Sequence, residues 1–305
     1  MMDSPSRQAA ARRALVARRV PWRRRLGALI RDRVAMVPLV RVLRGGALPA
    51  LVVPGAMRCG TTSLFGYLAG HPQLAASRRK EVHYFDLRFQ LGPAWYRGQF
   101  PRPGRDACGR RRLAFESSPY YLFDPRVPAR LHQLVPDARL VFLLRDPADR
   151  AYSHWRKNRR DGREPLSFAD ALDAEDDRLA GEEERMLADP RFASPLHQYY
   201  SYRRRGLYAE QLARWRLHFP ERRMLVVDSG RLFAEPARVF REVIGFLGLD
   251  PWEPSGFAVR NEGGGSDPAD DDARARLRGW FADHEQRLAE AIGWCPSRSR
   301  AVPAA

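Results

Sequence analysis

A glycine-framed loop near residue 60 is the part of the sequence whose residue types and spacing most directly suggest chemistry. It follows a short apolar stretch and precedes a helical pattern. In order, it reads Pro54-Gly55-Ala56-Met57-Arg58-Cys59-Gly60-Thr61-Thr62-Ser63. A strand, a glycine loop and a helix in this order direct several backbone N–H groups and the positive end of the helix at one point. The segment 55–62 therefore predicts a phosphate site, and a glycine turn without a ligand is the alternative.

Position 61 limits the kind of phosphate chemistry. Gly55 and Gly60 frame four residues, as in the G-x-x-x-x-G-K-[ST] phosphate loop, but Thr61 stands where that motif needs Lys. Enzymes that hydrolyse ATP or GTP use this Lys on the terminal phosphates and the next hydroxyl on magnesium. In this chain the cation of the loop is Arg58. The pattern disfavours magnesium-dependent nucleotide chemistry, and we expect no metal site.

A second reactive pair lies in the stretch Lys80-Glu81-Val82-His83. If a strand begins here, its alternation places Glu81 and His83 on one face. A carboxylate and an imidazole beside a bound phosphate could take the proton from an attacking hydroxyl or amine. We favour Glu81 as this base, because a single histidine on a strand more often has a structural role.

A third mark is the pair Arg145 and Ser153. Arg145 ends the apolar run 140–144, where many nucleotide hydrolases carry a magnesium-binding Asp. Its planar guanidinium suits two phosphate oxygens, and Ser153, about two turns into the next helix, adds a hydroxyl on the same side. The pair predicts a second phosphate site. The alternative is that Arg145 pairs with Asp146 or Asp149 at the edge of the sheet.

From Leu48 onward, short apolar runs alternate with longer helical stretches, and these elements must position the reactive residues. Such alternation predicts βαβ units around a parallel sheet. The candidate strands are residues 51–53, 82–85, 113–115, 140–144 and 224–227. The candidate helices are residues 61–69, 125–134, 147–159, 168–187, 207–218, 236–247 and 270–292. We expect an α/β protein with a P-loop-containing, three-layer α/β/α fold and a central, mainly parallel five-stranded sheet.

The net charge of +17 is typical of nucleic-acid-binding proteins, but it is unevenly distributed. Residues 1–45 hold 12 arginines against two acids, a balance of +10, which leaves +7 for the other 260 residues. We interpret residues 1–45 as a poorly ordered basic segment, 46–295 as one domain and 296–305 as a tail. Within the basic segment, residues 21–33 could contact an anionic membrane, and we expect no specific nucleic-acid partner.

Cysteine usage bears on the compartment. Cys59, Cys108 and Cys295 are odd in number and widely separated, which fits neither a disulfide framework nor a metal site. Arg interrupts every apolar run before residue 45, so this stretch does not resemble a signal peptide or a membrane span. We expect a cytoplasmic protein whose membrane contact, if it has one, is peripheral and uses the basic segment.

The three marks together resemble the sulfotransferases that use 3′-phosphoadenosine 5′-phosphosulfate, in particular the heparan sulfate sulfotransferases and their bacterial relatives. The resemblance covers most of residues 48–294. It implies metal-free, in-line transfer of a sulfuryl group from this co-substrate to a hydroxyl or amine of a carbohydrate, lipid or small metabolite. The alternatives are a P-loop kinase that uses ATP and a basic nucleic-acid-binding module.

The resemblance also implies a role for individual residues. Glu81 is implied as the catalytic base, with His83 nearby in the acceptor site, and Arg58 as the group that stabilises the leaving phosphate. The residues implied to hold the 5′-phosphosulfate are Arg58, Cys59, Gly60, Thr61, Thr62 and Ser63. Those implied to bind the 3′-phosphate are Arg145 and Ser153. The stretches Arg205-Gly206-Leu207-Tyr208 and Asn261-Glu262-Gly263-Gly264-Gly265 look like segments beside and over the donor, which adds Tyr208 and Gly264.

Two positions depart from the family pattern. The family usually has Lys where this chain has Arg58, and a guanidinium fork is not equivalent to a point charge. In Glu116-Ser117-Ser118-Pro119, Ser117 replaces a Lys of the heparan sulfate branch and removes a cation from the acceptor side. The second departure argues against a heparan-like polyanionic acceptor.

Overall fold

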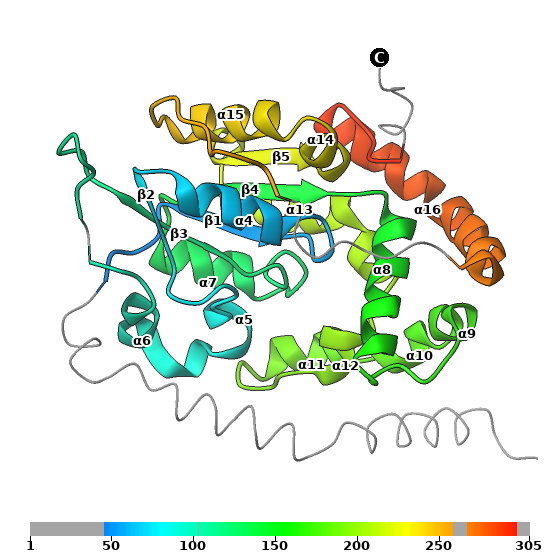
Figure 1. Cartoon of the computed structure of the whole chain (residues 1–305). Coiled ribbons are helices and arrows are strands. Elements are labelled where there is room, and N and C mark those ends of the chain that lie inside the picture. Colours follow the sequence, from blue (N-terminus) through cyan, green and yellow to red (C-terminus); the bar gives the residue numbers. More distant parts are fainter. Residues whose placement is uncertain (1–45, 103, 259–266, 298–305) are drawn as a thin grey trace, which may run out of the picture.

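A five-stranded parallel sheet forms the centre of the protein (Figure 1). The structure, a computed structural model, describes residues 46–102, 104–258 and 267–297. The strands are β1 (Leu51–Gly55), β2 (Leu74–Ala76), β3 (Leu113–Ser117), β4 (Arg139–Leu144) and β5 (Met224–Asp228). Their order is β2-β3-β1-β4-β5, so β1 is central and lies between β3 and β4. Parallel pairing brings the carboxyl ends of β3, β1 and β4 to one edge, where ligands bind in such sheets.

Helices connect the strands and cover the sheet. In the first half of the chain they are α4 (Thr61–Gly70), α5 (Tyr84–Leu87), α6 (Gly92–Gly98), α7 (Val127–Leu134) and α8 (Pro147–Arg160). Next come α9 (Phe168–Asp173), α10 (Glu175–Leu179), α11 (Glu182–Ala188), α12 (Pro195–Tyr199) and α13 (Tyr208–Arg216). The last are α14 (Ser229–Ala234), α15 (Pro236–Leu247) and α16 (Asp271–Ile292). Short 3-10 helices are η1 (Phe89–Leu91), η2 (Arg204–Gly206), η3 (Glu221–Arg223) and η4 (Pro268–Asp270).

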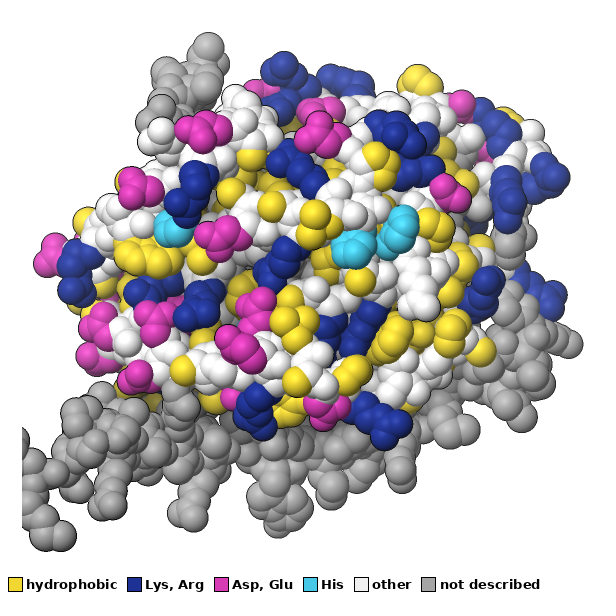
Figure 2. Space-filling view, turned by 180° about the vertical axis from the view of Figure 1, so that it is seen from behind, with side chains coloured by type: hydrophobic (Ala, Val, Ile, Leu, Met, Phe, Trp, Pro, Cys, Tyr) yellow, Lys and Arg dark blue, Asp and Glu magenta, His cyan; other side chains and the backbone are white. Residues whose placement is uncertain are grey.

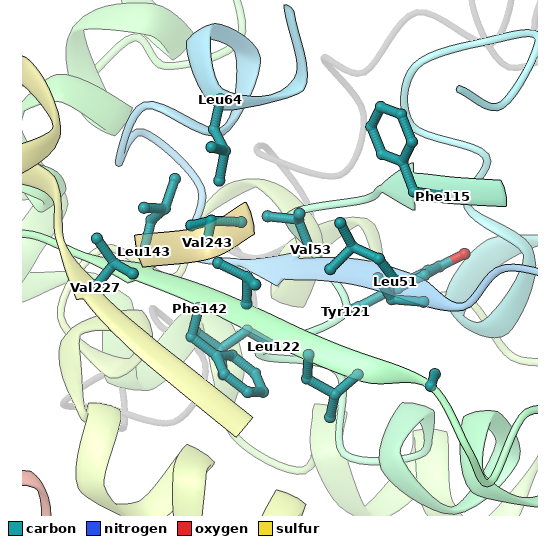
Figure 3. Packing of buried hydrophobic residues seen from close by; sticks show 14 of the residues in the cluster. Leu51, Val53, Leu64, Phe115, Tyr121, Leu122, Phe142, Leu143, Val227 and Val243 are labelled. Atoms are coloured by element: carbon teal, nitrogen blue, oxygen red, sulfur yellow. The ribbon is translucent and has the colours of Figure 1, made fainter. Parts of the chain in front are cut away.

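The sheet is buried on both faces. Leu143 of β4 points to the side of Leu64 from α4, whereas Phe142 points to the opposite side (Figure 3). There Phe142 meets Trp215 of α13, with ring centroids 5.4 Å apart. Burial on both faces explains why β4 is a continuous apolar run. The arrangement confirms the expected α/β fold with a parallel five-stranded sheet.

Helix α8 packs against buried apolar residues of two other helices. Ala148, Ala151 and Tyr152 belong to a second cluster, apart from the sheet, to which α9 and α16 also contribute. Asp146 caps the start of α8, because its side chain accepts a hydrogen bond from the N–H of Asp149. Packing and capping therefore fix the backbone of α8, the helix that carries Ser153.

One predicted strand was wrong. Residues 82–85 are not a strand: Glu81 and His83 have φ angles of 63° and 53°, and α5 begins at Tyr84. Two left-handed residues cannot continue a pleated strand. The missing strand is β2, a three-residue edge strand whose sequence Leu-Ala-Ala carries little strand signal.

One predicted helix was also wrong in extent. The stretch 168–187 is three helices, α9, α10 and α11, and α10 is separated from α11 because Ala180 leaves the helical conformation and Gly181 is left-handed with φ of 71°. The other predicted helices agree with the structure to within a few residues at their ends. The basic segment 1–45 and residues 298–305 of the tail lie outside the described residues.

Charges are mixed on the described surface. On the face shown in Figure 2, arginines alternate with Asp and Glu and do not gather into one basic area. No helix among the described residues is long and apolar enough to cross a membrane.

Candidate active site

The glycine loop, residues 55–60, connects β1 to α4 at the centre of the sheet. It is tied to the neighbouring strand, because the N–H of Ala56 donates to the carbonyl of Leu143 at 2.7 Å. Gly60, with φ of 86°, precedes α4, and the structure gives this helix start no side-chain cap among the residues it describes. A Cβ on Gly60 would lie 2.9 Å from the ring of Phe233, so the position requires glycine. The first N–H groups of α4 are thus available to an anion.

The side chains of the loop do not all face outward. Cys59 and Ser63 are fully buried and Thr61 is nearly so. Burial raises the pKa of the Cys59 thiol to about 11, so the thiol stays neutral at neutral pH. Cys59 can reach a ligand only through its backbone, whereas Arg58 and Thr62 are partly exposed.

Arg58 is joined to α8 across the loop. Its Nε donates to the hydroxyl of Ser153 at 2.9 Å, which brings together two residues predicted to bind opposite ends of one donor. Burial, followed by the charges of Arg160 and Arg145, lowers the pKa of Arg58 from its usual value. An arginine remains a cation at any physiological pH. Arg58, Arg145 and Arg160 therefore form a concentration of positive charge.

Arg145 directly follows β4, and 35% of its side chain is exposed. Its nearest carboxylate is Asp149, at 3.8 Å, which is the alternative considered from the sequence. That carboxylate accepts hydrogen bonds from Arg274 at 3.0 Å and Arg278 at 3.1 Å, both on α16. Since Asp149 is shared by several arginines, the charge of Arg145 is not neutralised by it.

Tyr208 contacts the backbone at the end of β4. It is buried, and its hydroxyl donates to the carbonyl of Arg145 at 3.0 Å. This bond holds the backbone where β4 ends. Gly264, by contrast, lies outside the described residues.

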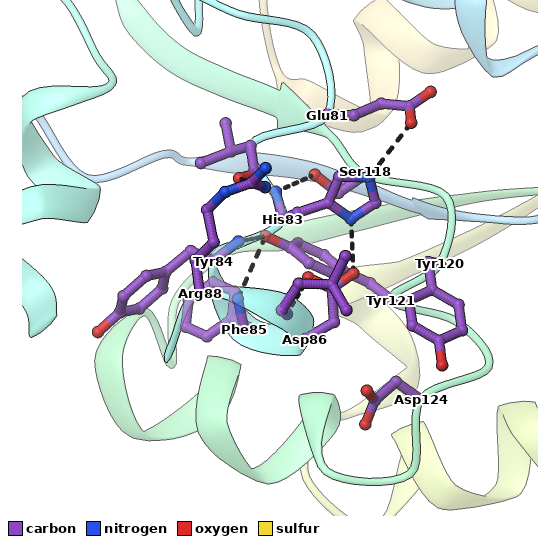
Figure 4. A network of polar contacts seen from close by, with 12 residues as sticks. Glu81, His83, Tyr84, Phe85, Asp86, Arg88, Ser118, Tyr120, Tyr121 and Asp124 are labelled. Carbon is purple, nitrogen blue, oxygen red and sulfur yellow. Dashed lines mark hydrogen bonds and ion pairs between the residues drawn. The ribbon is translucent and has the colours of Figure 1, made fainter. Parts of the chain in front are cut away.

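Residues 81–83 form the second part of the site, which we call the Glu-His turn (Figure 4). Lys80 Nζ donates to Glu81 Oε1 at 2.7 Å, and His83 Nε2 lies 3.3 Å from Glu81 Oε2. The other ring nitrogen of His83 lies 2.7 Å from Asp86 Oδ2. Glu81 and His83 are thus in contact, although a turn and not the predicted strand brings them together.

The charges of the Glu-His turn stabilise one another. Burial alone would raise the pKa of Glu81, but the hydrogen bond from His83 and the charge of Lys80 outweigh it and lower this pKa to about 2. Burial opposes the charged form of His83, yet Asp86 and Glu81 raise the pKa of this imidazole to about 9. At neutral pH, Glu81 is a carboxylate and His83 an imidazolium. Glu81 is therefore the group that can accept a proton.

Backbone contacts join the Glu-His turn to β3. The N–H of Glu81 donates to the carbonyl of Ser117 at 3.0 Å, and the N–H of His83 donates to Ser118 Oγ at 3.1 Å. Ser117 pairs with Val53 of β1, just before the glycine loop. The Glu-His turn therefore lies at the end of β3 and the glycine loop at the end of the neighbouring strand β1, at the same edge of the sheet.

The sequence-based reading did not include Asp86, which is buried and orients the ring of His83. The three-residue spacing between His83 and Asp86 is the sequence feature that could have indicated their contact. With a helix starting at Tyr84, a residue three positions after His83 faces back toward it, and a predicted strand conceals that relation.

Backbone strain marks the same residues. Among the non-glycine residues that the structure describes, those with positive φ are Arg58, Glu81 and His83. Such conformations cost about 1–3 kcal/mol each, persist only where the surroundings enforce them, and cluster at functional sites. They coincide here with the residues predicted to be catalytic.

The glycine loop and the cations near it indicate a class of fold. A phosphate-binding glycine loop after a central parallel strand, with cations at neighbouring strand ends, defines a P-loop-type α/β protein. Within residues 46–102, 104–258 and 267–297, no group of three or more His, Cys, Asp or Glu side chains could hold a metal ion.

Comparison with known proteins identifies the family. The pattern described as Sulfotransferase family matches residues 105–254. The crystal structure of a sulfotransferase from Alicyclobacillus acidocaldarius is 30% identical, with a TM-score of 0.63 over 83% of this chain and 99% of that one. This protein therefore belongs to the sulfotransferase family. Membership favours sulfuryl transfer over the ATP-kinase and nucleic-acid alternatives.

Curated relatives are larger proteins. The human bifunctional heparan sulfate N-deacetylase/N-sulfotransferase 3 is 28% identical over 277 residues, 80% of this chain and 30% of that protein. The mouse heparan sulfate glucosamine 3-O-sulfotransferase 6 is 32% identical over 201 residues, 66% of this chain and 52% of that protein. The chain thus spans between 30% and 52% of the length of these two relatives.

Proposed function

We propose that this protein transfers a sulfuryl group from 3′-phosphoadenosine 5′-phosphosulfate to a hydroxyl or amine of a carbohydrate or small-molecule acceptor. The observation that carries this proposal is the bond between Arg58 and Ser153 at the edge of the sheet where an ionised Glu81 also lies. Two sets of cations and hydroxyls suit a donor with phosphates at both ends. A carboxylate at the end of the neighbouring strand β3 suits an acceptor that must lose a proton.

The transfer is a single in-line displacement. The acceptor oxygen or nitrogen forms a bond to sulfur while the bond from sulfur to the 5′-phosphate oxygen breaks. Glu81 takes the proton of the acceptor, and Arg58 with the N–H groups at the start of α4 stabilises the charge on the departing phosphate. The pKa of Glu81, about 2, means that it is ready as a carboxylate but is a weak base, which fits a proton transfer late in the displacement.

The residues do not favour magnesium chemistry. Thr61 occupies the position of the Lys on which P-loop kinases depend, and its side chain is buried. Asp146, the carboxylate nearest the end of β4, caps α8 and also lies 3.7 Å from Arg278 Nε. Neither group is arranged as in an ATP-dependent phosphotransferase.

The acceptor is proposed only as a class. The relatives named above are sulfotransferases of heparan sulfate, which supports a carbohydrate. Ser117 is buried and uncharged where that branch carries Lys, so we propose an acceptor of lower charge than heparan sulfate.

The test supplies purified full-length protein with 35S-labelled donor and a panel of oligosaccharides, phenols, amines and lysate fractions. We expect 35S in an acceptor, with or without EDTA, and no transfer of 32P from γ-labelled ATP with magnesium. Glu253→Gln serves as a surface control, because Glu253 is 45% exposed and pairs with the exposed Arg241. Transfer of 32P without transfer of 35S would contradict the proposal.

The compartment and the basic segment 1–45 remain predictions. Cys59, Cys108 and Cys295 form no disulfide with one another, which supports the proposed cytoplasmic location. Removing residues 1–45 should leave sulfation intact and abolish any binding to anionic vesicles, as measured by co-sedimentation. Vesicle or DNA binding that persists without the segment would place the contact on the domain.

A further inference from the structure

A buried carboxylate lies beneath the Glu-His turn and is not used by the mechanism above. Glu116 of β3 has no exposed surface and accepts hydrogen bonds from three hydroxyls. Ser118 Oγ donates to its Oε2 at 2.7 Å. Tyr96 and Tyr121 donate to its Oε1 at 2.6 and 3.3 Å.

Two of these hydroxyls connect Glu116 to the Glu-His turn. Ser118 Oγ accepts the N–H of His83 at 3.1 Å. Tyr121 Oη accepts the N–H of Tyr84 at 2.8 Å and that of Phe85 at 3.4 Å. A hydroxyl has one proton, and here Glu116 accepts it from both Ser118 and Tyr121. Their lone pairs are thereby directed at the backbone of the turn.

The turn needs such support. Glu81 and His83 both have positive φ, which is unfavourable for residues with side chains. The N–H groups of Tyr84 and Phe85 open α5 and have no partner within that helix. The Tyr121 hydroxyl fixes these two N–H groups and the Ser118 hydroxyl fixes that of His83, which together fix the direction of the side chains of Glu81 and His83.

We propose that Glu116 is a positioning residue, which holds the Glu-His turn in its active geometry by accepting the protons of the Ser118 and Tyr121 hydroxyls. The proposal deepens the sulfotransfer function and rests on it for the activity measurements. It assigns no contact between Glu116 and substrate, because Glu116 is fully buried.

Protonation of Glu116 would weaken the hydrogen bonds by which it orients the Ser118 and Tyr121 hydroxyls. Burial raises the pKa of Glu116 to about 7, while the Tyr96 and Ser118 hydroxyls favour the carboxylate. The other charged groups facing it are Asp86, which raises the pKa, and His83, which lowers it. A protonated Glu116 turns one acceptor into a donor, so one of the three hydroxyls must reverse. Reversal of the Ser118 or Tyr121 hydroxyl makes Glu116 compete with the backbone N–H for its lone pairs and weakens the support of the turn.

The catalytic groups titrate elsewhere, which makes this switch measurable. The pKa of Glu81 is about 2 and that of His83 about 9. We expect kcat to fall as pH decreases through about 7, as Glu116 takes up a proton.

The test compares Glu116→Gln with Tyr96→Phe in the full chain. The amide of Glu116→Gln is a permanent donor, so kcat at pH 8 should fall roughly 10- to 100-fold with little change in donor KM, and the slope near pH 7 should vanish. Tyr96→Phe removes a donor from Glu116 without touching the turn. It should move the acid limb up by roughly one pH unit and leave the alkaline plateau intact.

Two outcomes would overturn the proposal. One is a Glu116→Gln enzyme with the kcat and pH profile of the wild type. The other, which decides the matter if Glu116→Gln does not fold, is an unmoved acid limb in Tyr96→Phe. The amide NMR signals of His83 and Tyr84 separate this proposal from the sulfotransfer function. If they titrate near pH 7 in a wild type that sulfates nothing, the sulfotransfer function fails and the positioning role stands.

Discussion

The glycine loop and the Glu-His turn lie at the ends of the neighbouring strands β1 and β3, yet they hold their charges differently. The glycine loop offers backbone N–H groups and arginines, and its Arg58 is held by an uncharged hydroxyl. The Glu-His turn alternates cation and anion from Lys80 to Asp86, so each charge has an opposite neighbour. The first region keeps unneutralised positive charge for an anionic ligand. The second fixes protonation states. Binding and proton transfer should therefore respond separately to substitution.

The largest effect should come from Glu81→Gln, which keeps the shape of the side chain and removes the base. General-base catalysis contributes about 10²- to 10⁴-fold, so we expect kcat to fall on the order of 1000-fold. Donor affinity, measured by calorimetry, should not change, because the proposed donor site is in the other region. Glu253→Gln is the matched control. A loss of donor affinity in Glu81→Gln would show that the two regions are not separate.

Arg58→Ala should follow, with kcat lowered about 100- to 1000-fold, as when one preorganised donor to a transition state is removed. Donor affinity should fall much less. Arg58→Lys restores the charge without the fork that reaches Ser153, so single-turnover rates of the two variants separate charge from geometry. An Arg58→Ala enzyme with normal turnover would refute the role.

Arg145→Ala sharpens the comparison from the binding side. Losing a charge-assisted contact of about 1.5–3 kcal/mol should weaken binding of adenosine 3′,5′-bisphosphate roughly 10- to 100-fold, with kcat at saturation unchanged. Adenosine 5′-phosphate lacks the 3′-phosphate, so its affinity should not respond to this substitution. An equal loss for both nucleotides by calorimetry would place Arg145 elsewhere.

The smallest effect should be that of Asp86→Asn on stability. Asp86 raises the folded-state pKa of His83 to about 9, above its unfolded value of 6.5. This pair therefore contributes fully below about pH 6.5, and its contribution disappears as pH rises through about 9. Urea unfolding at pH 6 should show Asp86→Asn less stable on the order of 2 kcal/mol, with a smaller difference at pH 9.5.

Asp176→Asn is the control for that experiment, because Asp176 pairs with Arg203 on the surface and is 63% exposed. It should show little change at either pH. A difference between wild type and Asp86→Asn that does not vary with pH would contradict the assigned charge of His83.

The two regions also differ in how far they could be predicted. Gly55 to Ser63 is one continuous stretch, and its glycines and hydroxyls predict a phosphate-binding loop without help from the rest of the chain. Arg145 follows an apolar run that is typical of a buried strand. The Glu-His turn depends on contacts distant in sequence, such as those of His83 with Ser118. Its alternation of polar and apolar residues looks like a strand, and tertiary contacts override that pattern. For this reason Asp86 and Glu116 emerged only from the structure.

The hydrogen bond from Arg58 to Ser153 occupies one lone pair of the hydroxyl and leaves its proton free to point outward. A 3′-phosphate that accepts this proton would pull on the same oxygen that holds Arg58 in place. Binding of the 3′-phosphate at Ser153 would thereby be coupled to the position of Arg58 at the 5′ end of the donor. A nucleotide lacking the 3′-phosphate would then lose rate as well as affinity.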